Sequence, residues 1–550
     1  MVDTTQQQHA TGFLGWVERN GNKLPDPVFI FVYLLIALMG LSVILALIGL
    51  SATLAPDVLN GMPDSQKARF GIGPDGIISA VSLFSPENLE RLWVEMPQTF
   101  THFHPLGYVL VVMLGAGVAE RSGLFSAAMR SAVRGAPTSL LTPVVALIAM
   151  VSNHAADAAY VVLIPLAGVL FASAGRHPIA GIAAAFAGVS GGFSANLAPG
   201  QLDALLYGIT QEGANILDPS YQPNFAGNMY FIQAMTFLFV PVIWYVTDRI
   251  IEPRLGPYKP TGTAENSFSE DAAPLTAAES KGLLWAGLAC LGVIGLWTFM
   301  AIGPGTPLYI TDAEYIAQGL SAEDAAAKEW FQRLSPFFQS LVGAFLALFL
   351  AAGWAYGAAA GTIKNHRDLV QMMTEAMQDM GYYLVLAFAA AHFVAMFGWS
   401  NLGLISAIHG ANAIESSGLP LPVLLTMIIL FSALINLFVG SASAKWALLA
   451  PVMVPMLMLL GVSPDGATAV YRVGDSATNI ITPLMVYFPL ILVFAQRWIG
   501  DFGIGSLTAI MIPYAIWLLI GGLALTVLFV VTGLPLGPGA PITYTLPGGA

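Results

Sequence analysis

Long runs of apolar residues, separated by shorter polar segments, extend along the chain from residue 28 onward. A helix of about 20 apolar residues crosses the hydrocarbon core of a bilayer, so each long run is expected to form one membrane-spanning helix. Seven runs are predicted to cross once: 28–54, 105–119, 229–246, 282–303, 337–361, 382–399 and 507–532. Two further stretches, 179–209 and 467–495, bring the predicted number of crossings to nine.

Small and polar residues interrupt the apolar pattern at corresponding places in the two halves of the chain. The interruptions are 152–157 (SNHAAD) and 192–199 (GFSANLAP) in the first half, and 440–446 (GSASAKW) and 474–479 (GDSATN) in the second. Unwound backbone persists at membrane depth only where it lines a cavity. Paired broken helices in two repeats therefore predict the substrate site of a secondary transporter.

The first interruption of each half lies in an apolar hairpin that is expected to turn around within the membrane, 140–174 and 421–461. The second divides a crossing helix, 179–209 or 467–495. The predicted fold class is an all-α polytopic membrane protein with an inverted repeat, nine transmembrane helices, two opposed re-entrant hairpins and two broken helices. Residues 1–250 form the first half with spans 1–4, residues 251–281 a cytoplasmic linker, and residues 282–550 the second half with spans 5–9.

The composition supports a membrane protein, since 56% of the residues are hydrophobic and only 9% are charged, whereas about a quarter are charged in a soluble domain. Residues 1–27 lack the apolar core of a cleavable signal, so the first run is expected to remain as a span. The single cysteine, Cys290, provides neither an internal disulfide nor a metal motif. A net charge of −12 argues against a nucleic-acid partner.

The distribution of basic residues predicts the orientation. With the amino terminus in the cytoplasm, the cytoplasmic basic residues are Arg19, Lys23, Arg121, Arg130, Arg134, Arg176, Arg249, Arg254, Lys259, Lys281, Lys364, Arg367 and Arg497. Those outside are then Lys67, Arg69, Arg91, Lys328 and Arg333. This excess fits the positive-inside rule and places the carboxyl terminus outside. The two hairpins then enter from opposite sides.

Six ionisable side chains lie in apolar surroundings near the interruptions: His154, Asp157, Asp203, Lys445, Arg472 and Asp475. A charge near the bilayer centre costs at least about 2.5 kcal/mol, so these residues require a partner or a function. Arg472 and Asp475 are three residues apart and are predicted to pair on one helical face. Either the pair is structural, or Arg472 binds a substrate carboxylate while Asp475 carries a proton or orients the arginine.

The remaining ionisable residues allow more than one interpretation. Asp203 is either an acidic residue at a helix N-terminus or a coupling carboxylate. His154 and Asp157 have the spacing of a metal pair, but no third ligand is evident, and a hydrogen-bonded hairpin tip is favoured. Lys445 and Trp446 suit an anionic aromatic solute, although Lys445 fits an anchor at the membrane interface equally well.

Side-chain oxygens at the interruptions also suit a sodium ion. They belong to Asn153, Ser194, Asn196, Ser476, Thr478 and Asn479. Together with carbonyl groups freed by the breaks, they provide the kind of ligands that bind coupling ions in transporters. The residues alone do not distinguish a sodium site from a proton-carrying carboxylate, and no organic cofactor is predicted.

The motifs at the breaks resemble those of the aminobenzoyl-glutamate transporter family, which belongs to the larger ion-transporter superfamily of two-hairpin carriers. They are 152–159 (SNHAADAA), 191–197 (GGFSANL), 443–447 (SAKWA) and 471–476 (YRVGDS). The resemblance extends over nearly the whole chain, and the motifs of the second half are the specific ones.

This resemblance implies a homodimer in the bacterial inner membrane, with a large aqueous basin. It also implies uptake of p-aminobenzoyl-glutamate, or export of sulfonamide antimetabolites driven by the proton gradient. The implied substrate-path residues are Asp203, Ser443, Trp446, Arg472 and Asp475, and the implied structural prolines are Pro464 and Pro483. Position 443 is a serine here, whereas asparagine can occupy it in relatives, so the detailed substrate preference is not transferred.

We therefore predict a proton-driven secondary carrier of p-aminobenzoyl-glutamate-like anions and sulfonamides that works by alternating access. A sodium-coupled carboxylate symporter is the alternative within the same class. A membrane-embedded enzyme, with His154 and Asp157 as acid and base, is disfavoured because the chain has no HExxH motif and no nucleophile elbow. An open channel is disfavoured because opposed hairpins suit a site that opens to one side at a time.

Overall fold

The structure is a computed structural model that describes residues 26–62, 64–134, 137–155, 159–219, 221–258, 274–482, 485 and 487–546. Asp157 and Pro483, which the sequence analysis singled out, lie outside these residues. The described part of the chain is helical apart from one two-stranded antiparallel sheet, β1 (Ser51–Thr53) with β2 (Ile77–Ser79). The predicted all-α membrane fold is thereby confirmed.

Each of the seven runs predicted to cross once forms a helix. These helices are α2 (Pro27–Leu47), α7 (His104–Arg121), α13 (Met229–Val246), α15 (Ala277–Phe299), α20 (Leu341–Ala360), α22 (Gly381–Trp399) and α28 (Ile504–Thr532). All except α7 are long and apolar enough to cross a membrane alone. Helix α7 reaches this length and hydropathy only together with α8 (Leu124–Arg134), from which it is bent by 65°. The apolar runs therefore predict where the long helices lie.

The first hairpin and the first broken helix are built from short helical pieces. They are η1 (Thr138–Leu140), α9 (Leu141–Val151), η2 (Ser152–Ala155), η3 (Ala159–Leu163), α10 (Ile164–Ser173), α11 (Pro178–Phe186), η4 (Ala187–Gly191) and α12 (Gln201–Ala214). Helicity changes to 3₁₀ or π geometry as the chain approaches each interruption, and it is lost between η4 and α12. Such irregular turns are frequent at functional sites.

The second hairpin consists of α24 (Leu421–Asn436) and α25 (Ala442–Leu459), and the second broken helix of α26 (Pro464–Thr478) and α27 (Phe488–Trp498). The tip of this hairpin is shorter than the sequence indicated. Ser441 caps α25, since its Oγ accepts a hydrogen bond from the backbone N–H of Ala444 at 3.3 Å. Lys445 and Trp446, which were expected in the interruption, lie instead in the first turns of α25.

The remaining elements surround these helices. They are α3 (Pro56–Gly61), α4 (Asp64–Phe70), α5 (Pro86–Val94), α6 (Met96–Thr101), η5 (Thr247–Ile251), α14 (Glu252–Leu255), α16 (Asp312–Ala317), α17 (Ala322–Ala326), α18 (Trp330–Arg333), α19 (Ser335–Gln339), α21 (His366–Asp379) and α23 (Leu402–Ser416). Asn401 adopts a positive φ of 61° between α22 and α23, and its amide donates to the carbonyls of Phe70 and Ser79. This contact fastens the segment between α2 and α7 to the end of α22.

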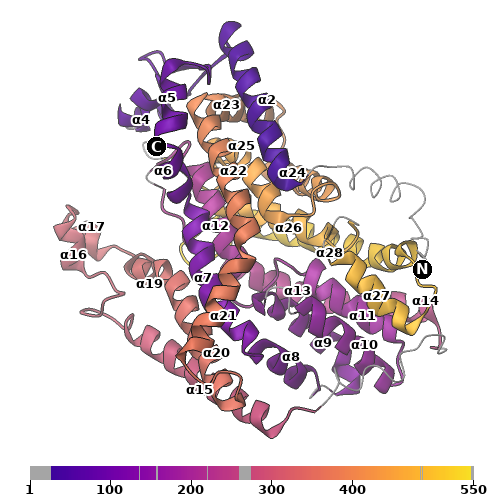
Figure 1. The fold of residues 1–550 in the computed structure, drawn as a ribbon. Coiled ribbons are helices and arrows are strands. Elements are labelled where there is room, and N and C mark those ends of the chain that lie inside the picture. The colour runs from indigo at the N-terminus through magenta and orange to yellow at the C-terminus, as the bar shows by residue number, and fades with distance from the viewer. Residues whose placement is uncertain are drawn as a thin grey trace.

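Figure 1 shows α15 and α20 beside α7, with the first hairpin next to α11 and α13, and the second hairpin above them in the view. Helix α24 packs on α26, and α12 contacts α7, α25 and α26. Helix α12, which follows the first break, therefore touches elements from both halves of the chain. Within the predicted linker, α14 and the start of α15 are helical, and residues 259–273 lie outside the described part.

An ionic cluster joins the first hairpin to η5 and α14. The guanidinium of Arg176, between α10 and α11, lies 2.5 Å from Asp248 Oδ1 and 2.5 Å from Glu252 Oε2. It also donates to Thr142 Oγ1 of α9 at 2.7 Å, and Thr142 donates to Asp248 at 2.8 Å. Arg176 thus links side chains of α9, η5 and α14 in one hydrogen-bonded cluster.

Replacing Arg176 with alanine is expected to lower the thermal stability of the purified protein, because Asp248 and Glu252 then lose their common counter-charge. The expected loss is about 2 kcal/mol, the usual worth of a hydrogen-bonded charged group. Thermal unfolding in detergent measures it. Arg254→Ala, which removes an exposed arginine of α14, serves as the matched control. Equal melting temperatures of the two variants would show that the cluster does not stabilise the hairpin.

Candidate functional site

The breaks of the two halves meet in the interior. The backbone N–H of Ser194, in the first break, donates a hydrogen bond to Ser476 Oγ of α26 at 2.9 Å. Both serines are buried. Ser476 comes shortly before α26 ends at Thr478, so the side chain of one interrupted helix satisfies backbone freed by the other. Within a membrane, this hydrogen bond satisfies a backbone N–H that would otherwise need a water molecule as its partner.

A buried ion pair also crosses between the halves. Arg472 Nη2 lies 2.5 Å from Asp203 Oδ1, and both side chains are at least nine-tenths buried. The second oxygen of Asp203 accepts the backbone N–H of Gly200 at 2.7 Å and caps α12. Asp203 is thus both a helix N-terminal acid and the partner of a buried arginine. The predicted pairing of Arg472 with Asp475 is wrong, because each of them pairs with a residue of another element.

Asp475 pairs with Lys445, and both side chains are almost completely buried. Lys445 Nζ also donates to Asn436 Oδ1 at 2.6 Å. The amide of Asn436 in turn donates to the carbonyl of Asp475, to Thr478 Oγ1 and to Asn479 Oδ1, at 2.7–2.9 Å. The interpretation of Lys445 as an interfacial anchor is wrong, because its ammonium group lies inside the protein among polar atoms of α24 and α26.

Trp446 lies in the adjoining core. Its ring stacks on Tyr471 with centroids 4.4 Å apart, and its Nε1 donates to Thr210 Oγ1 of α12 at 2.9 Å. Thr210 also bonds to Thr468 of α26 at 2.7 Å. In the first half, Tyr160 of η3 stacks on Tyr487 with centroids 4.3 Å apart. In each half, therefore, an aromatic residue of the hairpin stacks on a tyrosine of the second broken helix or its interruption.

A cavity of about 330 Å³ opens next to the ion pair of Asp203 and Arg472. This volume is at the lower end of the range for small-molecule pockets. Its lining residues include Asn153, His154, Tyr160, Phe193, Ser194, Asn196, Gln201, Asp203, Tyr383 and Arg472. Arg121 and Asp379, which form an ion pair between α7 and α21, also line it. The cavity thus places aromatic rings, neutral hydrogen-bonding groups and two ion pairs around one space.

Several polar atoms around this cavity are buried and have no hydrogen-bond partner within the described residues. They are Asn153 Nδ2, Ser194 Oγ, Tyr383 Oη and Arg472 Nε. A buried donor without a partner costs about 1–3 kcal/mol, and such groups are rare in native structures. Donors from both halves therefore surround the cavity, as a ligand with several acceptor oxygens requires.

His154 and its neighbours form a hydrogen-bonded group at the first hairpin tip. His154 Nδ1 lies 2.8 Å from Asn196 Nδ2, and Gln201 Nε2 donates to the carbonyl of His154 at 3.1 Å. Asp157 lies outside the described residues. Within the described part of the chain, no three histidine, cysteine or acidic side chains come together around a possible metal ion.

The predicted sodium ligands are divided between two places. Asn153, Ser194 and Asn196 line the cavity, whereas Ser476 and Asn479 are bonded within the protein core. Asn479 Oδ1 accepts from Asn436, and Asn196 Oδ1 accepts from the N–H of Leu197 at 2.8 Å.

Two further positions that the resemblance implied, Ser443 and Pro464, lie at the starts of helices α25 and α26. Ser443 Oγ lies 3.2 Å from Ser441 Oγ in the first turn of α25, beside a small gap that Tyr383 also lines. Pro464 begins α26 directly after the N-cap Ser463, a position where proline is favoured because no N–H is required there. Pro483 lies outside the described residues.

Sequence reasoning missed Asn436, Thr210, Thr468 and Tyr383. Asn436 had a usable signal, since it is an amide inside the apolar run of α24 and such residues in membrane helices face polar partners. Threonine and tyrosine occur throughout the apolar runs, so their positions gave no comparable signal.

Two interrupted helices that satisfy each other, beside a polar cavity in an all-α membrane fold, define a membrane transporter. Comparisons with known proteins agree with this class. Residues 12–544 match the family described as "AbgT putative transporter family", and the chain belongs to this family. A p-aminobenzoyl-glutamate transport protein of Escherichia coli (strain K12) is 34% identical over 525 residues, which cover 96% of each chain.

Two solved structures are also similar. The YdaH transporter of Alcanivorax borkumensis, whose topology is described as unusual, is 40% identical with a TM-score of 0.82, and the match covers 94% of this chain and all of that one. MtrF of Neisseria gonorrhoeae, described with a class of antimetabolite efflux pumps, is 41% identical with a TM-score of 0.84, and the match covers 96% of this chain and all of that one. The fold is therefore shared with transporters of this family.

The ion pair of Asp203 and Arg472 predicts a non-additive pattern of stability. Asp203→Asn retains an oxygen that can accept the Gly200 N–H, but it leaves the buried Arg472 without a counter-charge. Arg472→Gln likewise leaves the buried Asp203 without a counter-charge. Each single change is expected to cost about 3–5 kcal/mol. The double variant, with no buried charge left unpaired, is expected to melt at a higher temperature than either single variant. Additive losses in detergent melting experiments would contradict this pairing.

Proposed function

We propose that the protein is a secondary active transporter of anionic aromatic solutes of the p-aminobenzoyl-glutamate type, and of sulfonamide antimetabolites, driven by the proton gradient. The observation that carries the proposal is the cavity of about 330 Å³, whose wall contains Arg472 and hydrogen-bonding atoms that have no partner among the described residues. Tyr160, Phe193 and Tyr383 provide flat surfaces for an aryl ring, and the guanidinium suits a carboxylate or a sulfonyl group. The names of the relatives support the same solute class.

The network of the second hairpin supports coupling to protons. The ammonium of Lys445 lies between Asp475 and Asn436, where a bound cation would have its ligands. Asp475 Oδ2 is buried and has no hydrogen-bond partner among the described residues, so it is available for a proton. We assign the proton to Asp475. Protonation there removes the counter-charge of Lys445 and thereby alters the contact between α25 and α26 at each cycle.

The proposed transport body consists of the two hairpins with their broken helices, and it moves against a scaffold of the remaining spans. The proposed assembly is a homodimer in the bacterial inner membrane, with the amino terminus in the cytoplasm and the carboxyl terminus in the periplasm. In this orientation, Arg121 and Asp379 place the mouth of the cavity on the cytoplasmic side. The basic residues support the orientation through the positive-inside rule.

Transport in sealed liposomes tests the proposal. Labelled p-aminobenzoyl-glutamate and a sulfonamide are followed while pH and sodium gradients are imposed separately. Flux that follows the pH gradient without sodium is expected. Flux only with sodium would favour the sodium-coupled carboxylate symporter and the oxygens of Asn153, Ser194 and Asn196 as its ion site. Absence of flux for both compounds would reject the solute class.

Replacing Asp475 with asparagine is expected to abolish solute accumulation driven by a pH gradient, because the amide carries no exchangeable charge. Exchange of labelled for unlabelled solute, which needs no gradient, should persist and shows that the variant is folded. Asp465→Asn, on the same helix, is the control, since Asp465 bonds to Tyr221 away from Lys445. Retained accumulation in Asp475→Asn would remove Asp475 from the coupling mechanism.

Arg472→Lys is expected to raise the KM for p-aminobenzoyl-glutamate about tenfold or more, because the ammonium cannot bind a carboxylate with two parallel N–H groups. The charge opposite Asp203 is kept, so the amount of folded protein should change little. Initial rates in liposomes and the yield of monodisperse protein check both statements. An unchanged KM would leave Arg472 with a purely structural role.

A further inference from the structure

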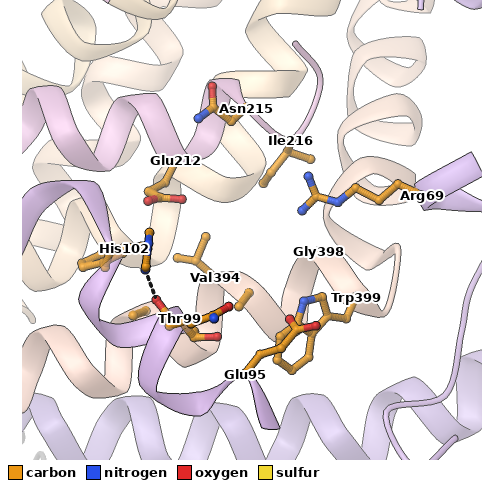
Figure 2. Close-up of a pocket in the computed structure, with 14 residues that line it drawn as sticks. Arg69, Glu95, Thr99, His102, Glu212, Asn215, Ile216, Val394, Gly398 and Trp399 are labelled. Atoms are coloured by element: carbon orange, nitrogen blue, oxygen red, sulfur yellow. Dashed lines mark hydrogen bonds between the residues drawn. The ribbon is translucent and has the colours of Figure 1, made fainter. Parts of the chain in front are cut away.

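A second polar pocket lies at the other end of α12. It has a volume of about 200 Å³, and we call it the end pocket. Its polar and aromatic lining residues include Arg69, Glu95, Thr99, His102, Glu212 and Trp399. They come from α4, α6 and their flanking turns, and from the ends of α12 and α22 (Figure 2). Asp203 and Glu212 are nine residues apart on α12, so the two pockets lie at opposite ends of about 14 Å of one rigid helix.

The charged side chains of the end pocket differ in whether they have a bonded partner in the protein. Glu212 Oε1 lies 2.8 Å from His104 Nδ1 and 3.1 Å from the backbone N of His104, so two hydrogen bonds hold this carboxylate. Arg69 and Glu95 form no ion pair within the part of the chain that the structure describes. Figure 2 shows the guanidinium of Arg69 projecting into the open space, with Glu95 and Trp399 on the other side of it. Within the described residues, the pocket therefore holds a guanidinium and a carboxylate that attract each other without forming an ion pair.

These residues specify an occupant. A guanidinium binds a carboxylate, a carboxylate accepts N–H groups of an amine, and an indole ring provides a flat apolar face. Metal binding is disfavoured, because no three potential metal-ligating side chains gather in the described residues. We propose that the end pocket is a second binding site for the transported solute, in which Arg69 binds a carboxylate, Glu95 accepts from the aryl amine and Trp399 covers the ring. This inference rests on the proposed function, whose solute carries all three groups.

The position of the pocket gives the second site a role in transport. Helix α12 carries Asp203 beside the central cavity and Glu212 beside the end pocket, and each carboxylate bonds to a different element, α26 or α7. A displacement of α12 therefore alters both pockets together. The central cavity opens on the side of the protein where Arg121 and Asp379 lie. In the proposed cycle, the solute binds in the end pocket when it is on the opposite side.

Equilibrium binding of labelled p-aminobenzoyl-glutamate to the purified full-length protein in detergent tests this proposal. The wild-type protein is expected to bind two molecules per chain. Arg69→Ala should weaken one of the two sites about tenfold or more, and Arg69→Lys should restore part of the affinity. Lys67→Ala, on the same short helix but outside the pocket, should bind as the wild type does. Arg472→Ala should retain the end-pocket site alone.

The role of Glu95 is tested with benzoyl-glutamate, which lacks the amine. It should bind the end pocket more weakly than p-aminobenzoyl-glutamate, and Glu95→Gln should reduce that difference. One site in the wild type that Arg69→Ala leaves unchanged would overturn the second site while leaving the proposed function intact. No binding at all would instead reject the proposed function. Two sites that are both insensitive to Arg69 would place the second site elsewhere.

Discussion

The structure depends on one constraint, which is that a helix broken inside a membrane must find hydrogen-bond partners within the protein. Here each break finds some of its partners in its own half of the chain and others in the opposite half. Ser476 accepts the backbone N–H of Ser194, and Arg472 pairs with Asp203. These contacts hold α12 against α26, and the hairpins pack around them. The two halves of the chain are therefore joined through the buried polar groups of their breaks.

The two halves solve this constraint differently. Around Asn436 and Lys445 most polar groups of the second half are bonded within the protein, and the space is filled. Around the first break a cavity remains, and hydrogen-bonding atoms of both halves have no partner there within the part of the chain that the structure describes. A filled network suits a group that changes its protonation, whereas an open cavity suits a solute. The proposed function follows this division, with the solute beside the first break and the proton in the second hairpin.

Much of the fold could be predicted from the sequence. The thickness of the bilayer sets the length of the apolar runs, and its lack of water restricts where polar residues can interrupt them. Helix α23 was missed because its apolar residues follow α22 without a polar separator long enough to mark a new element. Most of the predicted site residues that the structure describes lie around the two breaks, but their partners were not predicted. Helical spacing suggested Arg472 with Asp475, yet spacing describes one helix only, and the partner of Arg472 lies 269 positions away. For Lys445 the sequence left a solute-binding cation and an interfacial anchor open, because nothing local indicates that Asn436 and Asp475 enclose it.

The double bonding of Asp203 has a consequence for how tightly a solute is held. One of its oxygens caps α12 and the other binds Arg472, so the protein contains its own competitor for the guanidinium. In the proposed cycle a solute carboxylate must displace this internal carboxylate, and the net affinity is the difference between two ion pairs. Because the hydrogen bond that caps α12 stays in place, Asp203 remains close to Arg472 and can pair with it again when the solute leaves. A carrier built in this way binds its anion weakly and releases it quickly, so rapid transport is favoured over high affinity.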